Sequence, residues 1–140
     1  VRAHARGRCG VLALDRQGFM NALTEGSGTI GGHLQPPPDG LWGMPAEVLA
    51  TLPGFGPDLE KNREEARALM RKAGYGPDRP LAIKIFTRAV SLYRSPAAVL
   101  ANQLQDIYIE AGLDVVETSH WFTRIGRRDY SLALETTGNA

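Results

Sequence analysis

The order of elements between residues 81 and 119 constrains this chain more than any other feature. The segment LAIKIFT, residues 81–87, alternates its side chains with the period of two that a β-strand requires. A helix is predicted next, with Ser95 as its N-terminal cap, Pro96 at its first position and Gly112 as its stop. LDVVETS, residues 113–119, predicts a second strand. This succession predicts a right-handed crossover between parallel strands, and therefore an α/β domain.

The sequence after this unit predicts one more helix and one more strand. A short helix is expected around HWFTRIGRR, residues 120–128, and DYSLALET, residues 129–136, alternates as a third strand. The helix between the first two strands places its apolar side chains on one face: Leu100, Leu104, Ile107 and Ala111. A sheet strand so near the end of the chain leaves an open edge, so we expect the next element of a larger fold to be missing.

The first part of the chain is predicted to be helical at both ends and irregular between them. One amphipathic helix is expected over residues 9–23, ended by Gly26. Residues 27–57 form a connection dense in Gly and Pro. Three successive prolines at 36–38 exclude a regular helix there, whereas AEVLATL, residues 46–52, predicts a short one.

The charged stretch NREEARALMRKAGYG, residues 62–76, poses the choice between a working site and a scaffold helix. Asn62 and Glu65 have the spacing of a capping box, which predicts a helix start at this point. Gly74 is predicted to end the helix in the left-handed conformation, with Tyr75 as the apolar contact that follows. Because apolar residues recur on one face and acids precede bases, we predict a scaffold helix with a solvated charged face.

Composition and spacing argue against several function classes. The net charge is +1 and no basic stripe is present, so we expect no nucleic-acid partner. No apolar run approaches the ~20 residues that cross a bilayer, so no transmembrane segment is predicted, nor is an export signal within this chain. Cys9 and the three histidines lack metal-ligand spacing, and no catalytic or phosphate-binding motif is present. We therefore predict no metal, no cofactor and no enzymatic activity.

The connection after the first predicted strand is the remaining candidate for a site. Four side chains stand at or beyond the carboxyl end of that strand: Thr87, Arg88, Tyr93 and Arg94. Open α/β sheets bind ligands at this edge. The competing interpretation is that both arginines are solvated and that Tyr93 packs on the next helix. Trp42 and Trp121 stay open between a ligand-stacking wall and the core, with the core favoured.

The order of segments resembles the second lobe of extracellular solute-binding proteins of family five, the peptide, nickel and opine receptors of ABC importers. The resemblance runs from about Arg8 to the end of the chain. Its most specific parts are Leu14-Asp15-Arg16, the stretch from Asp-Leu-Glu-Lys to Ala-Gly-Tyr, and Gln103-Leu104 ahead of Ala111-Gly112-Leu113. The first eight residues, VRAHARGR, depart from the family pattern.

The resemblance implies a receptor without enzymatic activity that closes two lobes around a small-molecule or peptide ligand and delivers it to a membrane permease. It implies a partial lobe of the type II periplasmic-binding-protein fold, with a mixed sheet flanked by helices, and a periplasmic location for the parent protein. Residues 1–140 would form one incomplete lobe, with an atypical arm at 1–8, the connection at 27–57 and the helix and strand region at 58–140. From their positions, we expect substrate contacts at Thr87, Arg88, Tyr93 and Trp121.

Two other interpretations stay open at this stage. One is a free-standing α/β module, either a small enzyme or a domain that binds a partner. The other is a degraded gene fragment without a selected function. If the receptor interpretation holds, we expect the chain alone to bind the ligand poorly, because one lobe keeps only part of the contacts and cannot exclude water.

Overall fold

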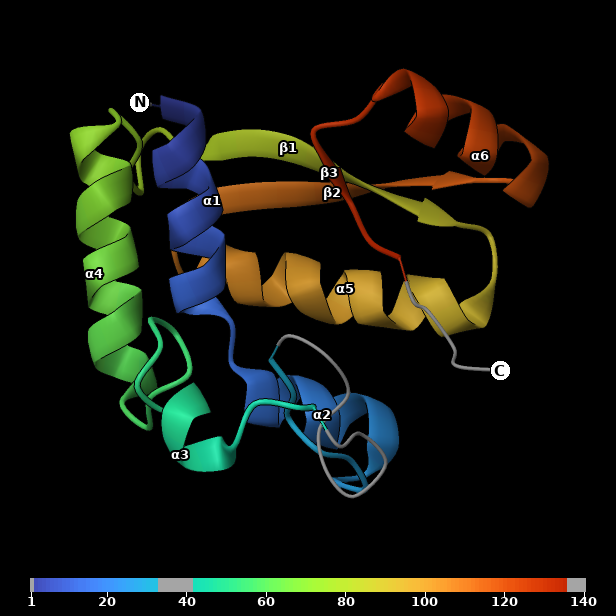
Figure 1. Ribbon diagram of the computed structural model, residues 1–140. Helices are drawn as coiled ribbons and strands as arrows, with labels where there is room; N and C mark the ends of the chain where they lie inside the picture. Colours follow the sequence, from blue (N-terminus) through green and yellow to red (C-terminus); the bar gives the residue numbers. More distant parts are fainter. Residues whose placement is uncertain (1, 33–41, 136–140) are drawn as a thin grey trace.

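The computed structural model describes residues 2–32 and 42–135, and within these ranges the side chains from Arg8 onward. The elements follow the chain in this order (Figure 1): α1 (Arg2–Ala13), α2 (Arg16–Thr24), α3 (Ala46–Leu49), α4 (Leu59–Lys72), β1 (Leu81–Arg88), α5 (Ser91–Gln105), β2 (Ile109–Val116), α6 (Thr118–Arg127) and β3 (Leu132–Ala133). The triple proline, for which an extended path was predicted, lies outside the described residues, as does His33.

The described strands form one sheet in the order β2-β1-β3, and both pairings are parallel. β1 pairs with β2 along its full length, from Leu81 opposite Ile109 to Arg88 opposite Val116. β3 adds only two paired residues to the other side of β1. In Figure 1, α5 runs along one face of the sheet, and α6 lies over the other face near the carboxyl ends of the strands. The predicted α/β fold with parallel neighbouring strands is confirmed.

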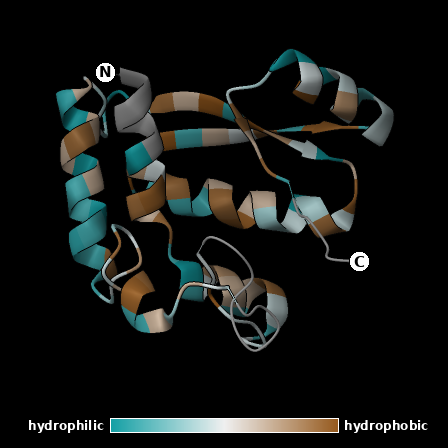
Figure 2. Ribbon diagram, viewed as in Figure 1, coloured by the Kyte–Doolittle hydropathy of each residue, from teal (hydrophilic) through white to brown (hydrophobic). Residues whose placement is uncertain are grey.

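The core lies between α5, the sheet and the helix pair α1 and α4. Figure 2 shows hydrophobic ribbon along β1 and β2 and a mostly hydrophilic α4. The fully buried side chains at this junction come from every one of these elements or from the turn after α5: Cys9, Leu12, Ala66, Met70, Ile85, Ala97 and Ile107. Burial raises the pKa of the Cys9 thiol, whose Sγ lies 3.7 Å from the carbonyl oxygen of Ala66, so this cysteine acts as a small core residue.

The helix predicted over residues 9–23 is two helices, separated at Leu14 and Asp15. The Asp15 carboxylate accepts a hydrogen bond of 2.8 Å from the backbone N–H of Gly18, so Asp15 caps a new helix instead of continuing the old one. A Cβ at Gly18 would lie 2.4 Å from that carboxylate, so the glycine makes room for the cap. The stripe of apolar residues alone could not show this break. Residues 2–8, predicted as an arm, belong to α1.

The predicted capping box at Asn62 is wrong, because the residue that caps α4 lies four positions earlier. Asp58 caps it by accepting a 3.0 Å hydrogen bond from the N–H of Lys61, which leaves Asn62 inside the first turns. The predicted end is confirmed: Gly74 has φ +89°, and Tyr75 donates its N–H to the carbonyl of Met70 at 3.0 Å. This is the Schellman pattern, and Tyr75 packs on the core.

The predicted bounds of α5 are also wrong at both ends. α5 begins at Ser91, so Pro96 lies inside it, near enough to the N-terminus that only one backbone hydrogen bond is forfeited. It ends at Gln105, before a turn in which Tyr108 has φ +64°. Ala111 and Gly112, predicted for the helix, pair with β1 instead. Pairing of eight residues with β1 stabilises the strand more than two further turns would stabilise the helix. The helical periodicity of the sequence alone favours the longer helix.

Candidate functional site

The carboxyl edge of the sheet brings Thr87, Arg88 and Tyr93 together, as their predicted positions require. Thr87 is fully buried at the end of β1, and its hydroxyl lies 3.3 Å from the carbonyl oxygen of Tyr93 in the first turn of α5. Tyr93 is itself buried, with 9% of its surface exposed. Thr87 therefore ties the strand end to the helix and is closed to solvent.

Arg88 is the partly exposed member of this group. Its Nη1 donates a 2.7 Å hydrogen bond to the Tyr93 hydroxyl, and its guanidinium carbon lies 4.6 Å from the centre of the Tyr93 ring. On the other side, Nη2 and Nε lie 3.1 Å and 3.4 Å from the hydroxyl of Thr118, the first residue of α6. Arg88 thus joins β1 to both helices that flank the sheet. The competing interpretation predicted a solvated Arg88, whereas the side chain is hydrogen-bonded on two sides. The same interpretation predicted that Tyr93 packs on the helix, and Tyr93 is buried there.

Trp121 lies in the core between α6 and the sheet. Only 2% of it is exposed, and its ring stacks on Phe86 with 4.5 Å between centroids and 13° between planes. Tyr130 stacks on Phe86 at 6.1 Å, and the guanidinium of Arg124 lies 4.2 Å from the same ring. The core role favoured for Trp121 is confirmed. Trp42, for which the core was also favoured, is 83% exposed, and that prediction is wrong.

A pocket of about 430 Å³ opens beside this aromatic stack. It is lined by parts of β1, β2, α6 and the segment that leads to β3: Ala82, Ile83, Lys84, Phe86, Asp114, Arg124, Asp129, Tyr130 and Ser131. Arg124 is neutralised by Asp114 at 3.0 Å and by Asp129 at 3.2 Å. Asp114 and Asp129 are thus already paired with Arg124. Among the described residues, Lys84 is the one basic side chain of the pocket lining that has no ion-pair partner.

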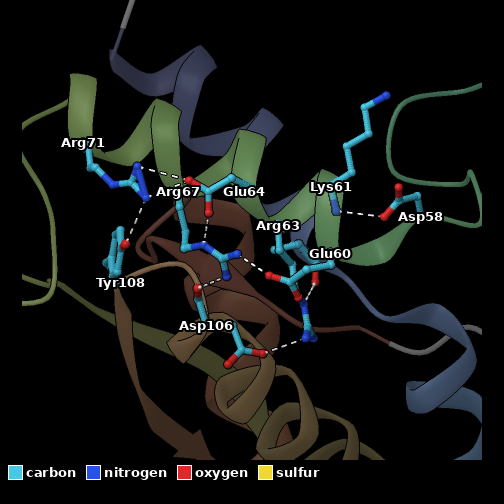
Figure 3. Close-up of polar contacts among 10 residues, drawn as sticks. Asp58, Glu60, Lys61, Arg63, Glu64, Arg67, Arg71, Asp106 and Tyr108 are labelled. Atoms are coloured by element: carbon cyan, nitrogen blue, oxygen red, sulfur yellow. Dashed lines mark hydrogen bonds and ion pairs between the residues drawn. The ribbon is translucent and has the colours of Figure 1, made fainter.

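The charged face of α4 is solvent-exposed, as predicted, and its side chains are also paired with one another (Figure 3). Arg67 pairs with Glu60 and Glu64, and it donates to the carbonyl oxygen of Asp106. Hydrogen bonding from Arg67 lowers the pKa of Glu64. In Figure 3, Arg63 reaches the carboxylate of Asp106, at 3.0 Å, from the same helix. The scaffold role is supported, but the charges also hold the turn between α5 and β2, which the sequence alone did not indicate.

Sequence reasoning missed a second polar junction, between α5 and the break after α1. The side-chain amide of Gln103 accepts from the N–H of Asp15 and donates to its carbonyl, both at 3.0 Å. Arg16 donates to the carbonyl oxygens of Val11 and Gly54, and its guanidinium carbon lies 3.8 Å from the centre of a phenyl ring, that of Phe55. Burial lowers the pKa of Arg16. The only signal was that both segments, Leu14-Asp15-Arg16 and Gln103-Leu104, are specific to the resemblance.

Three further sequence predictions concern Arg94, metal binding and membrane-spanning helices. Arg94 is exposed on α5, as its competing interpretation predicted. Within residues 2–32 and 42–135, no three His, Cys, Asp or Glu side chains are placed to hold a metal ion. Over the same residues, no helix has both the length and the apolar character needed to cross a membrane.

No protein-family model and no curated protein sequence matches this chain. Solved structures do. The murein tripeptide binding protein MppA of Escherichia coli matches 92% of the chain with a TM-score of 0.67 and 15% identity. NikA from Brucella suis, in complex with Fe(III)-EDTA, matches 97% with a TM-score of 0.68 and 19% identity. AgaA from A. tumefaciens R10, in complex with agropinic acid, matches 95% with a TM-score of 0.61 and 21% identity.

The chain spans only about a quarter of each of these proteins: 25% of MppA, 28% of NikA and 26% of AgaA. At these identities the likeness concerns the fold, and fold alone does not fix a ligand. The matches cover 92% to 97% of this chain and are therefore not confined to one of its elements. The resemblance inferred from the sequence is therefore confirmed at the level of the fold, and this chain has the fold of about a quarter of a periplasmic solute-binding protein.

Proposed function

We propose that this chain is part of the substrate-binding protein of an ABC importer. Such a protein captures a small solute or peptide in the periplasm by closing two lobes around it, and it delivers the solute to a membrane permease without chemical change. The observation that carries the proposal is the fold match over more than nine-tenths of the chain to a murein tripeptide binding protein and to proteins in complex with Fe(III)-EDTA and with agropinic acid.

Residues 1–140 would supply one incomplete lobe, with residues 27–57 as its connection. A two-lobed receptor gains affinity by enclosing its ligand and excluding water, and this chain spans about a quarter of the proteins that it matches. The chain by itself should therefore bind the solute weakly. Within the lobe, we propose that Arg88 contacts the solute, since it is the partly exposed member of the predicted group, whose other members are buried. Thr87, Tyr93 and Trp121 would hold the strand end and both helices around it.

Sequencing the DNA on both sides of this reading frame tests the proposal. We expect a continuous frame that encodes the rest of a two-lobed receptor, and isothermal titration of that whole protein with peptides, nickel chelates and opines should then find a ligand. Changing Arg88 to Ala in the whole protein should weaken that ligand's binding at least tenfold, or about 1.4 kcal/mol. A neighbouring sequence with no such receptor, or a whole protein that binds none of these solutes, would contradict the proposal.

A partner-binding module is the second candidate, because one side of β2 is not paired within the described residues. Leu113 and Val115 on this strand are 39% and 37% exposed, and open apolar strand edges attract further strands. Analytical ultracentrifugation of the 140-residue chain separates the two. A well-behaved monomer with no flanking receptor sequence would favour the module.

A further inference from the structure

The pocket beside the aromatic stack lies on a part of the sheet away from the strand end at Arg88. Its floor includes the first half of β1, where Ala82 and Lys84 are exposed on the same face of the strand as the buried Phe86. In Figure 1, α6 lies over this face only near the carboxyl ends of the strands. The pocket volume of about 430 Å³ falls within the roughly 300–1,000 Å³ that is typical of small-molecule sites.

The charged side chains of this pocket leave one charge of each sign in excess. Arg124 pairs with Asp114 at 3.0 Å and with Asp129 at 3.2 Å, so this cluster of two acids and one base keeps one net negative charge. The Asp129 side chain is 70% exposed, so its carboxylate is open to a further partner. Lys84 lines the same pocket and forms no ion pair or hydrogen bond among the described residues. The pocket therefore offers a cation and an anion to a ligand at the same time.

An aromatic ring stands between solvent and the buried stack. Tyr130 is 40% exposed, and its ring lies at 11° to that of Phe86 with 6.1 Å between centroids. Phe86 is held in turn by its stacking on the buried Trp121. The backbone of Asp129 is also fixed, because its N–H donates to the carbonyl of Arg124 at 3.0 Å and its carbonyl accepts from Nη2 of Arg124 at 3.1 Å. The aromatic wall and the acid are thus preorganised, which lowers the entropic cost of binding.

We infer that this pocket binds an aromatic zwitterion, such as a free aromatic amino acid. The anionic group of the ligand pairs with Lys84, its cationic group pairs with the carboxylate of Asp129, and its ring lies on Tyr130. An organic ion of a single sign would satisfy one of these charges and lie near a like charge, so we expect it to bind more weakly. The inference goes beyond the proposed function and does not rest on it, since every contact belongs to this chain.

The test is an NMR titration of the complete 140-residue chain with L-phenylalanine, at constant pH and ionic strength. Three analogues each lack one feature: 3-phenylpropionate lacks the ammonium, 2-phenylethylamine lacks the carboxylate and glycine lacks the ring. We expect L-phenylalanine to shift the backbone amides of residues 82–86 and 129–131 saturably, with a millimolar dissociation constant. Each analogue of a single charge should bind at least about threefold more weakly, and glycine at least about tenfold, because exposed ion pairs contribute less than burial of a ring.

Variants assign each charge of the ligand to its residue, with folding checked by circular dichroism. Lys84→Gln should weaken L-phenylalanine binding at least about threefold and should remove the preference over 2-phenylethylamine. Asp129→Asn should remove the preference over 3-phenylpropionate. Lys72→Gln changes an exposed lysine of α4 outside the pocket, so this matched control should leave the dissociation constant within about twofold. Tyr130→Ser should reduce the preference for L-phenylalanine over glycine.

Three results would overturn the inference: no saturable shift at residues 82–86 and 129–131, equal binding of L-phenylalanine and its two singly charged analogues, or equal effects of Lys84→Gln and Lys72→Gln. None of them bears on whether a whole receptor captures a solute, which the titration of the whole protein decides. Conversely, a whole protein that binds none of the receptor solutes would contradict the receptor function, while saturable binding of L-phenylalanine to this pocket would still support the inference.

Discussion

Replacing Gln103 with Ala removes the side chain that joins α5 to the break between α1 and α2. The amide accepts from the Asp15 N–H and donates to the Asp15 carbonyl, each at 3.0 Å, and the contact is partly buried. Asp15 also caps α2 through Gly18, so the same residue serves both the helix start and the link to α5. The substitution therefore tests whether this junction stabilises the fold.

The cost follows from what each backbone group of Asp15 would have left. Its carbonyl oxygen keeps the 2.8 Å hydrogen bond from the N–H of Phe19, so that group loses one of two donors, at about 0.5–1 kcal/mol. Its N–H has no other partner among the described residues, and an unsatisfied, partly buried donor costs about 1–2 kcal/mol. The sum is about 2 kcal/mol of lost unfolding free energy.

Urea unfolding followed by circular dichroism at 222 nm measures this difference. With a slope of about 2 kcal/mol per molar urea, typical for this size, the midpoint should fall by about 1 M. Gln105→Ala, an exposed position at the end of the same helix, is the matched control and should change the unfolding free energy by less than about 0.5 kcal/mol. Equal effects of the two substitutions would refute the reasoning.

Three further changes test other parts of the fold, each by the same urea assay. Asp58→Ala should cost about 1 kcal/mol by removing the cap of α4, and Asn62→Ala should cost less than half of that; the reverse order would restore the capping box at Asn62. Hydrogen bonding from Arg67 lowers the pKa of Glu64, so its stabilising contribution is present above the unfolded-state pKa and is lost as the pH falls through the folded-state value. The stability difference between the wild type and Glu64→Gln should therefore be larger at pH 7 than at pH 3, and a pH-independent difference would argue against the pairing. Trp121→Ala should cost about 3–5 kcal/mol because the ring is 2% exposed and stacked in the core, and a cost below about 1 kcal/mol would contradict that placement.

Among the candidate site residues, sequence position predicted proximity but not exposure. Thr87, Arg88 and Tyr93 do meet at the carboxyl edge of the sheet, because the strand ends there and the helix begins three residues later. Thr87 is closed to solvent and Arg88 is partly exposed. This difference depends on the face of the sheet to which each side chain points and on the helix that covers that face. The approach of Thr118 to Arg88 across thirty residues could not be predicted from local patterns.

The errors at helix ends have a common physical cause. Asp15 and Asp58 both cap helices. The stripe of apolar residues on both sides of Asp15 predicted one continuous helix, and the capping-box spacing predicted Asn62 as the cap in place of Asp58. Several Ser, Asp and Asn residues near a helix start can each satisfy the same orphan N–H groups, and the chain uses the one whose backbone is free to leave the helix.

By itself, the sequence determined the α/β class, the parallel pairing implied by strand, helix and strand, and the Schellman end at Gly74, because these depend on local periodicity and on glycine's access to positive φ. Only the tertiary structure decided where α5 gives way to β2, since that boundary is set by pairing with β1 along its whole length. It also decided that Arg88 contacts the neutral hydroxyls of Tyr93 and Thr118, while the arginines of α4 and Arg124 are paired with acids. Charge pairing depends on distances between segments far apart in the chain, and a sequence carries those distances only through the fold.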